Sequence, residues 1–207
     1  MTKGLFVVFE GLDGAGTTTQ TALLREHLES LGRVCVSTFE PTDLTLGKVL
    51  RTALRGQWGE EASEELKPEA VALLFAADRL DHLTRRVEPA MQRGEIVISD
   101  RYVYSSLAYQ GSLLSPDWVQ NINKHAREPD LTVYVRVSVE TSLSRVGSRG
   151  DTRDIYEKEE MLRSVFTGYE SLVERGGMAN LVVVDGEQSV EQVFHDVTRA
   201  IQPLLSK

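Results

Sequence analysis

The stretch that decides the fold of this chain is Gly11-Leu12-Asp13-Gly14-Ala15-Gly16-Thr17-Thr18-Thr19-Gln20. It follows the apolar run of residues 5–9 and precedes a segment of helical pattern, so it stands between a strand and a helix. Gly11 and Gly16 have the spacing of a phosphate-binding loop, and Thr18 holds the position of its metal-binding hydroxyl. Glycines let successive backbone N–H groups face a phosphate, and the next helix adds its positive N-terminus. The stretch therefore predicts a nucleoside triphosphate site rather than a chance glycine turn.

One member of the loop pattern is missing. The position that holds lysine in the usual pattern is Thr17, and a threonine brings no positive charge to the terminal phosphates. The motif by itself therefore predicts phosphate binding and leaves phosphate transfer open.

Length and composition narrow the class of protein. The chain has 207 residues, 41% hydrophobic and 26% charged, which suits one soluble globular domain. Its net charge of −8 argues against a nucleic-acid surface, so local arginines must hold any anionic substrate. Cys35 is the only cysteine, which excludes an intrachain disulfide and a cysteine-rich zinc site. With no apolar run near the roughly 18 residues of a membrane span, we expect a cytoplasmic enzyme without membrane or nucleic-acid partners.

Apolar runs alternate with helical patterns along the whole chain. The runs typical of buried parallel strands are residues 5–9, 34–39, 96–99, 131–137 and 181–184. Helical patterns cover residues 18–31, 68–92, 140–146, 156–174 and 190–205. The alternation predicts an α/β fold, a doubly wound five-stranded parallel sheet flanked by helices of the P-loop NTPase type, in a single domain over residues 1–207. Ligands then bind at the C-terminal ends of the strands, where we expect Asp13, Glu40, Asp100 and Asp185.

Two side-chain pairs outside the loop carry candidate chemistry. Asp100 ends an apolar run and can orient Mg²⁺ beside Thr18, while Arg101 can bridge two phosphates; the alternative is a solvated ion pair. Phe75 and Arg79 are four residues apart on a helical pattern, so a ring and a guanidinium share one face and can hold a base. The pattern alone favours the plainer alternative, a core phenylalanine beside a surface arginine.

These residues carry a resemblance over essentially the whole length. The chain resembles the thymidylate kinases (dTMP kinases), which are P-loop nucleoside monophosphate kinases. The matching pieces are Phe9-Glu10-Gly11-Leu12-Asp13-Gly14-Ala15-Gly16, Glu40-Pro41-Thr42, Leu74-Phe75-Ala76-Ala77-Asp78-Arg79, Asp100-Arg101-Tyr102, Ser105 to Gln110, and Pro129-Asp130-Leu131-Thr132. Several pieces are common singly, but their joint order and spacing are specific.

The resemblance implies that ATP phosphorylates dTMP to dTDP with Mg²⁺, in a homodimer. It implies catalytic roles for Asp13, Arg101, Arg149 and Arg153. It implies ATP binding by Gly11, Leu12, Asp13, Gly14, Ala15, Gly16, Thr17, Thr18, Thr19 and Arg145, and a metal site at Thr18 and Asp100. It implies dTMP binding by Glu40, Pro41, Arg51, Phe75, Arg79, Arg101, Ser106, Tyr109 and Gln110. In these roles Phe75 stacks on thymine, Arg79 donates to its O4 edge, and Tyr109 packs beneath the deoxyribose.

The resemblance also implies a lid at about residues 145–157. Family members with Gly rather than Arg inside the phosphate loop carry a catalytic arginine in the lid, and Gly14 places this chain with them. By resemblance Arg145 stacks on adenine, and Arg149 or Arg153 faces the phosphates. The chain departs from the family at residues 154–157, where an arginine is usual at the second position and Ile155 stands instead.

Two other functions compete with an active dTMP kinase. Thr17 favours a nucleotide-binding protein with little catalysis, whereas a complete acceptor site together with a lid favours an enzyme. A kinase of a different nucleoside monophosphate is the other alternative, although Phe75, Arg79 and Tyr109 indicate a deoxypyrimidine. A GTPase is disfavoured because Asn123-Lys124-His125-Ala126 lacks the aspartate of a guanine-reading motif.

Overall fold

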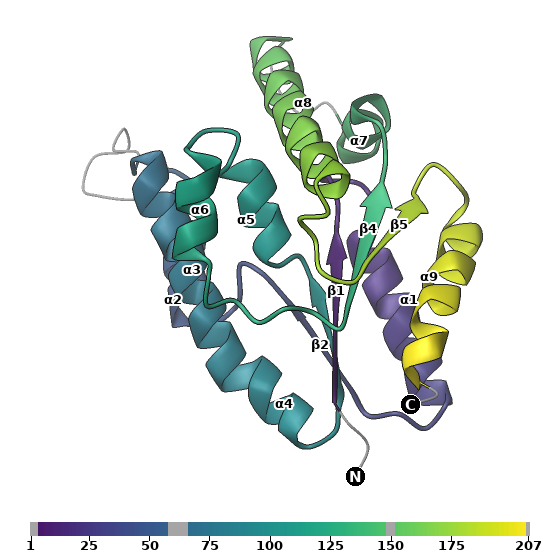
Figure 1. The fold of residues 1–207 in the computed structure, drawn as a ribbon. Helices are drawn as coiled ribbons and strands as arrows, with labels where there is room; N and C mark the ends of the chain where they lie inside the picture. The colour runs from purple at the N-terminus through teal and green to yellow at the C-terminus, as the bar shows by residue number, and fades with distance from the viewer. Residues whose placement is uncertain (1–3, 58–65, 148–151, 206–207) are drawn as a thin grey trace.

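A five-stranded parallel sheet forms the centre of the protein (Figure 1). The structure is a computed structural model that describes residues 4–57, 66–147 and 152–205, with backbone only for 152–157. The strands are β1 (Leu5–Glu10), β2 (Cys35–Phe39), β3 (Ile96–Asp100), β4 (Leu131–Arg136) and β5 (Leu181–Asp185), in the order β2-β3-β1-β4-β5. The predicted α/β fold with five parallel strands is confirmed.

The register brings the C-terminal ends of the central strands to one edge. Phe9 of β1 pairs with Asp100 of β3, and Asp100 also pairs with Phe39 of β2. On the other side of β1, Glu10 pairs with Tyr134 of β4. Because β1 is covered on both faces, its residues are all buried, and it forms the core with β3, β4 and the facing helices.

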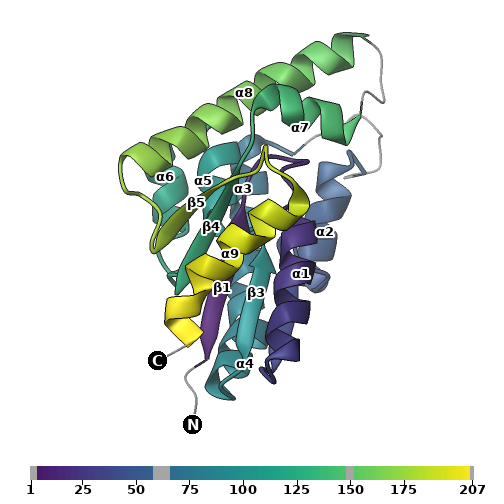
Figure 2. The same cartoon turned by 90° about the vertical axis from the view of Figure 1, so that its right-hand side faces the viewer.

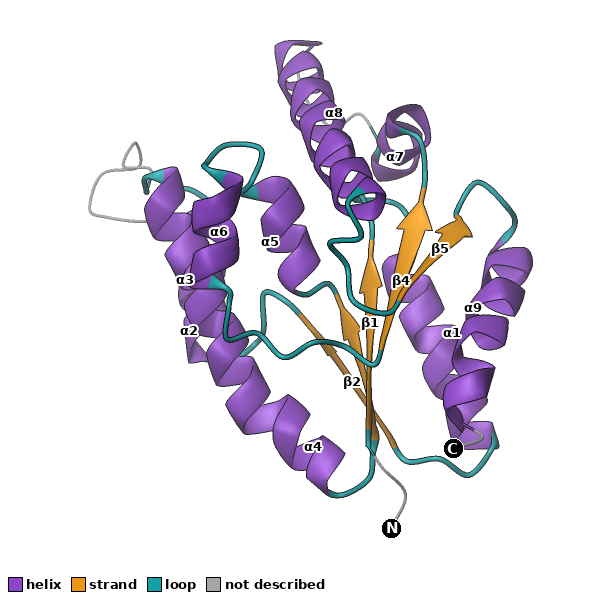
Figure 3. Ribbon diagram, in the orientation of Figure 1, coloured by secondary structure: helices purple, strands orange, loops and turns teal. Residues whose placement is uncertain are grey.

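Helices cover both faces of the sheet, as the orange strands between two purple groups in Figure 3 show. They are α1 (Thr17–Ser30), α2 (Thr45–Leu54), α3 (Pro68–His82), the π-helical η1 (Leu83–Val87), α4 (Glu88–Gln92), α5 (Val103–Tyr109), α6 (Pro116–Ile122), α7 (Val139–Val146), α8 (Thr152–Glu174) and α9 (Val190–Leu205). Helices α1 and α9 lie side by side on one face (Figure 2). Helices α7 and α8 lie beyond the ends toward which β1 and β4 point. Among the described helices, none combines the length and apolarity that a membrane crossing requires.

The predicted helices differ from the observed ones in three ways. The single helix expected over residues 68–92 is divided into α3, η1 and α4, and the π-helical turns come just before Pro89, whose ring crowds the carbonyl four residues earlier. Helix α8 begins at Thr152 rather than 156, so part of the predicted lid is helical. Helices α2, α5 and α6 were not predicted, and α5 and α6 have only seven residues each, too few to display an apolar period.

Candidate active site

The phosphate loop joins β1 to α1, and its shape depends on two glycines. Gly14 and Gly16 have φ angles of 78° and 96°, a backbone region that residues other than glycine rarely adopt. Helix α7 holds the loop from outside, because Ser142 Oγ donates to the carbonyl of Asp13 at 2.6 Å. A Cβ on Gly14 would lie 3.1 Å from the Ser142 carbonyl oxygen, so this close approach requires glycine. The N-terminus of α1, with the buried Thr17 in its first turn, faces the loop.

The predicted metal residues lie together at the start of α1 and the end of β3. Thr18 Oγ1 donates to Asp100 Oδ2 at 2.5 Å. The other carboxylate oxygen, Asp100 Oδ1, is buried and has no hydrogen-bond partner. Among the residues that the structure describes, no group of three or more histidines, cysteines, aspartates or glutamates gathers as a metal cluster. Two protein oxygens beside a phosphate loop still fit Mg²⁺, which takes few protein ligands and completes its shell with water and phosphate oxygens.

Arg101, which directly follows β3, is held across the mouth of the loop. Its Nη2 pairs with Asp13 Oδ1 at 2.6 Å, and its Nη1 donates to the Gly11 carbonyl at 2.9 Å and to Ser105 Oγ at 3.2 Å. Its φ of 70° is unusual for a residue with a side chain and costs on the order of 1–3 kcal/mol, a strain typical of functional sites. Burial acts to lower the pKa of Arg101, but Tyr109, Tyr169, Asp13 and Glu10 raise it overall. The guanidinium is therefore charged.

A cavity of about 230 Å³ opens beside Arg101, and we call it the acceptor pocket. It is lined by Asp13, Glu40, Pro41, Leu54, Phe75, Arg79, Arg101, Tyr102, Ser105, Ser106, Tyr109 and Gln110. All the residues predicted for dTMP except Arg51 are among them. Arg51 does not line the pocket; its guanidinium donates to the carbonyls of Pro41, which does line it, and of Thr42.

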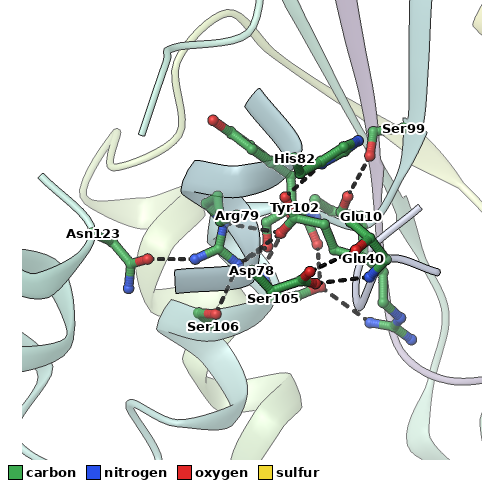
Figure 4. Close-up of polar contacts among 12 residues, drawn as sticks. Glu10, Glu40, Asp78, Arg79, His82, Ser99, Tyr102, Ser105, Ser106 and Asn123 are labelled. Atoms are coloured by element: carbon green, nitrogen blue, oxygen red, sulfur yellow. Dashed lines mark hydrogen bonds and ion pairs between the residues drawn. The ribbon is translucent and has the colours of Figure 1, made fainter. Parts of the chain in front are cut away.

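Arg79 is the most constrained residue of the acceptor pocket (Figure 4). It is 1% exposed, so the alternative of a surface arginine is wrong. Its Nε donates to Glu40 Oε2 at 2.9 Å, its Nη2 to Ser106 Oγ at 2.9 Å, and its Nη1 to Asn123 Oδ1. The cation is thus fixed by a carboxylate that follows β2, a hydroxyl on α5 and an amide that follows α6.

Glu40 is held from a second side. His82 Nδ1 lies 2.9 Å from Glu40 Oε1, and His82 Nε2 lies 2.7 Å from Thr38 Oγ1. The Glu40–Pro41 peptide bond is cis, and the turn that follows is tied to α3 because Asp78 accepts from the Thr42 amide at 2.7 Å. Helix α3 therefore positions both sides of the acceptor pocket through buried polar contacts.

A second cavity, of about 310 Å³, lies on the other side of the phosphate loop, and we call it the donor pocket. It is lined by Gly14, Ala15, Gly16, Thr19, Gln20, Arg145, Gly186, Gln188, Val190 and Val193. Arg145, on α7, donates to the Gly186 carbonyl at 3.0 Å, so its guanidinium crosses this pocket. Of the two predicted phosphate-facing arginines of the lid, Arg149 and the side chain of Arg153 lie outside the described residues.

Comparison with known proteins decides the family. The thymidylate kinase family model matches residues 9–197. The chain belongs to the thymidylate kinase family. It is 38% identical over 201 residues to a probable thymidylate kinase of Pyrococcus abyssi, covering 97% of each chain. It is 36% identical over 199 residues to one of Methanocaldococcus jannaschii, covering 95% of each. The predictions of this family and of a phosphotransferase enzyme are confirmed.

Some residues of this thymidylate kinase family site were not predicted from the sequence. Asn123 and His82 hold the Arg79–Glu40 pair, and Glu10 and Tyr169 lie behind Arg101. The sequence held a signal that could have identified Glu10, because it is a carboxylate directly after an apolar strand pattern. Tyr169 gave none, since it belongs to an ordinary amphipathic helical pattern. Asp185 ends β5 as expected, but it lines neither pocket and accepts from the Glu187 amide.

Proposed function

We propose that this chain transfers the γ-phosphoryl group of ATP to the phosphate of dTMP, giving ADP and dTDP. One observation carries the proposal: a base-sized pocket built on Phe75 and a buried Arg79 opens onto Arg101 and Asp13 at the mouth of a phosphate loop. The bond from the γ-phosphorus to the β–γ bridging oxygen breaks, and a bond to a phosphate oxygen of dTMP forms. Such a reaction requires alignment and charge neutralisation more than covalent catalysis.

In the donor pocket, ATP places its phosphates in the loop formed by Gly11, Leu12, Asp13, Gly14, Ala15, Gly16, Thr17, Thr18 and Thr19. Leu12 is 1% exposed, so its part is made by the backbone. Arg145 stacks on adenine between α7 and the Gly186 turn. Support for this assignment is the position of the Arg145 guanidinium across the donor pocket.

In the acceptor pocket, Phe75 stacks on thymine while Arg79 and Ser106 face its carbonyl edge. Ser106 Oγ already accepts from Arg79, so its own proton is free to be donated to a base oxygen. Gln110 Oε1 is buried without a partner and is available to the base. Tyr109 packs beneath the deoxyribose; burial raises its pKa to about 12, so it acts as a neutral phenol. Glu40 and Pro41 form the supporting turn.

Arg101 and Asp13 stand where the two phosphates meet. Arg101 Cζ lies 5.3 Å from the Tyr109 ring centre, and its Asp13 partner is about half exposed, so the guanidinium can exchange this contact for phosphate oxygens. Arg51 supplies further positive charge behind the Glu40–Pro41 turn. We place the lid at about residues 145–157. Its Arg149 and Arg153 are the arginines that we propose to close over the triphosphate.

Thr18 Oγ1 and Asp100 are the residues that would hold Mg²⁺, directly or through water. The orphaned Asp100 Oδ1 supports this placement. When bound there, the ion neutralises phosphate charge.

We also propose that residues 1–207 act as one nucleoside monophosphate kinase domain and that the chain forms a homodimer. Leu73 and Leu80 support the dimer, because they lie one heptad apart on α3 and are 50% and 42% exposed.

An ADP-release assay with ATP and four acceptors, dTMP, dUMP, dCMP and dAMP, tests the function. We expect dTMP to be preferred over dCMP, because cytosine presents an amino group where Arg79 and Ser106 donate. A lost buried hydrogen bond of about 1–3 kcal/mol corresponds to roughly 5- to 150-fold in kcat/KM. Equal turnover of dCMP and dTMP would overturn the base assignment. Nucleotide binding without any ADP release would instead favour the binding-only alternative raised by Thr17.

A further inference from the structure

Behind Arg101 lies a buried carboxylate that the proposed reaction does not use. Glu10, the last residue of β1, is fully buried. Its Oε1 accepts from the amides of Tyr102 at 3.0 Å and Ser105 at 3.2 Å. Its Oε2 accepts from Ser105 Oγ at 2.5 Å and from the Tyr169 hydroxyl at 2.9 Å. One carboxylate therefore caps the first turn of α5 and binds a tyrosine of α8.

Ser105 connects this carboxylate to Arg101. Its hydroxyl donates to Glu10 and accepts from Arg101 Nη1, while the Tyr169 hydroxyl lies 3.0 Å away (Figure 4 shows the Glu10 and Ser105 contact). A serine hydroxyl has one proton, so the direction of its bond to Glu10 decides whether its lone pairs face Arg101. The orientation of Ser105 is thus set by Glu10, whose Oε2 also accepts the proton of Tyr169.

The Arg101 guanidinium has two supports on its buried side, the Gly11 carbonyl and the Ser105 hydroxyl at Nη1, and one exposed support, Asp13 at Nη2. Asp13, on the exposed side, has a side chain that is 49% exposed and stands where phosphates enter. Ser105, on the buried side, has its hydroxyl held by the fully buried Glu10. The buried side therefore defines where the guanidinium sits once Asp13 yields to phosphate oxygens.

Tyr169 is brought to this place by a close helix contact. It lies on α8, and the preceding residue is Gly168, where a Cβ would come within 3.1 Å of Ala108 Cα and of the Ala108 carbonyl oxygen on α5. The Tyr169 ring is fully buried and stacks on Tyr134 with ring centres 5.0 Å apart. Helix α8 starts at Thr152, within the segment proposed as the lid.

We propose that Tyr169 is a positioning residue for Arg101, acting through Ser105 and Glu10 and tying helix α8 to the phosphate-bridging guanidinium. The proposal rests on the proposed function in assigning Arg101 to the phosphates. Tyr169 lines neither pocket; by donating to Glu10 Oε2 beside the Ser105 hydroxyl, it holds the carboxylate that directs the Ser105 proton and so the place of Arg101.

Tyr169→Phe removes only that hydroxyl, and Tyr134→Phe is its matched control. The two rings are stacked neighbours, both fully buried, and Tyr134 donates to another carboxylate, Glu170, at 3.3 Å. We expect Tyr169→Phe to lower kcat about 5- to 30-fold with KM for dTMP and ATP changed less than about twofold, because misplacing a catalytic group costs rate. Tyr134→Phe should leave kcat within about twofold. A double-mutant cycle with Ser105→Ala should be non-additive for Tyr169→Phe and additive for Tyr134→Phe.

A second measurement does not depend on turnover. In ¹⁵N–¹H spectra of the arginine side chains, with Arg101 assigned by loss of its signal in Arg101→Lys, Tyr169→Phe should shift or broaden that signal and Tyr134→Phe should not. An unchanged Arg101 signal, or equal kcat in the two variants, overturns the positioning role. If the wild type itself releases no ADP while the Arg101 signal moves only in Tyr169→Phe, the proposed function fails and the positioning role stands.

Discussion

Glu40→Gln should lower the melting temperature (Tm) of the protein substantially. The substitution keeps the shape of the side chain and removes its charge. Glu40 faces Arg79 and His82, and the three side chains are 3%, 1% and 0% exposed. Gln at this position would leave the buried guanidinium of Arg79 without its counter-charge.

The magnitude follows from the burial. Removing one partner of a buried ion pair typically destabilises by about 3–5 kcal/mol, because the other charge stays desolvated. For a chain of this size, 1 kcal/mol corresponds to roughly 2–4 °C in Tm. We therefore expect Tm to fall by roughly 6–20 °C.

Thermal unfolding followed by circular dichroism at pH 7 measures the change. Glu29→Gln is the control, because Glu29 pairs with Arg25 on the surface of α1 and such exposed pairs contribute little. A Tm that falls no further in Glu40→Gln than in Glu29→Gln would refute the reasoning, since Arg79 would then have found another partner or reached water.

Three further predictions concern the loop and the single cysteine. Thr18→Ala should lower kcat and raise the Mg²⁺ concentration needed for half-maximal rate, whereas an unchanged Mg²⁺ titration would contradict the metal assignment. Thr17→Lys should raise kcat less than about tenfold if Arg101 and the lid arginines have the phosphate-facing roles proposed above, because such arginines are worth several orders of magnitude in related reactions; a larger rise would show that the missing lysine limits the rate. Burial raises the pKa of Cys35 from 9.0 to about 11, so its alkylation by iodoacetamide at pH 8 should be about 100-fold slower than that of an ordinary thiol and should keep increasing up to about pH 11. Mass spectrometry measures that rate, and levelling off near pH 9 would contradict the shift.

The central sheet was predictable because its strands are short, largely apolar runs, four of which are followed directly by a carboxylate. Each observed strand lies within two residues of its expected bounds. The short helices α5 and α6 were not predictable in the same way, since their positions depend on long-range contacts such as the capping of α5 by Glu10. The sequence pattern therefore predicted the strands, which carry their own apolar residues, and did not predict the short helices, which are held in place by distant residues.

The sequence named residues that the structure brings to one pocket, whereas it did not name most of the residues that support them. Motif order identified Phe75, Arg79 and Arg101, but it did not show that Arg79 is buried. The partners that bury it, Glu40 and Asn123, stand 39 and 44 residues away along the chain. Tyr169 stands 159 residues from Glu10, and nothing in the pattern of α8 distinguishes it from other core positions.

The phosphate loop lies between the donor pocket and the acceptor pocket. Among the described residues, none lines both the donor and the acceptor pocket, and the pockets belong to opposite sides of β1, with β3 on one side and β5 on the other. Neither nucleotide therefore has to pass the other to reach its place. We expect the two substrates to bind in either order, so a non-reactive analogue of either nucleotide should inhibit competitively against its own counterpart and noncompetitively against the other substrate. Uncompetitive inhibition by one of the analogues would instead show a fixed order of binding.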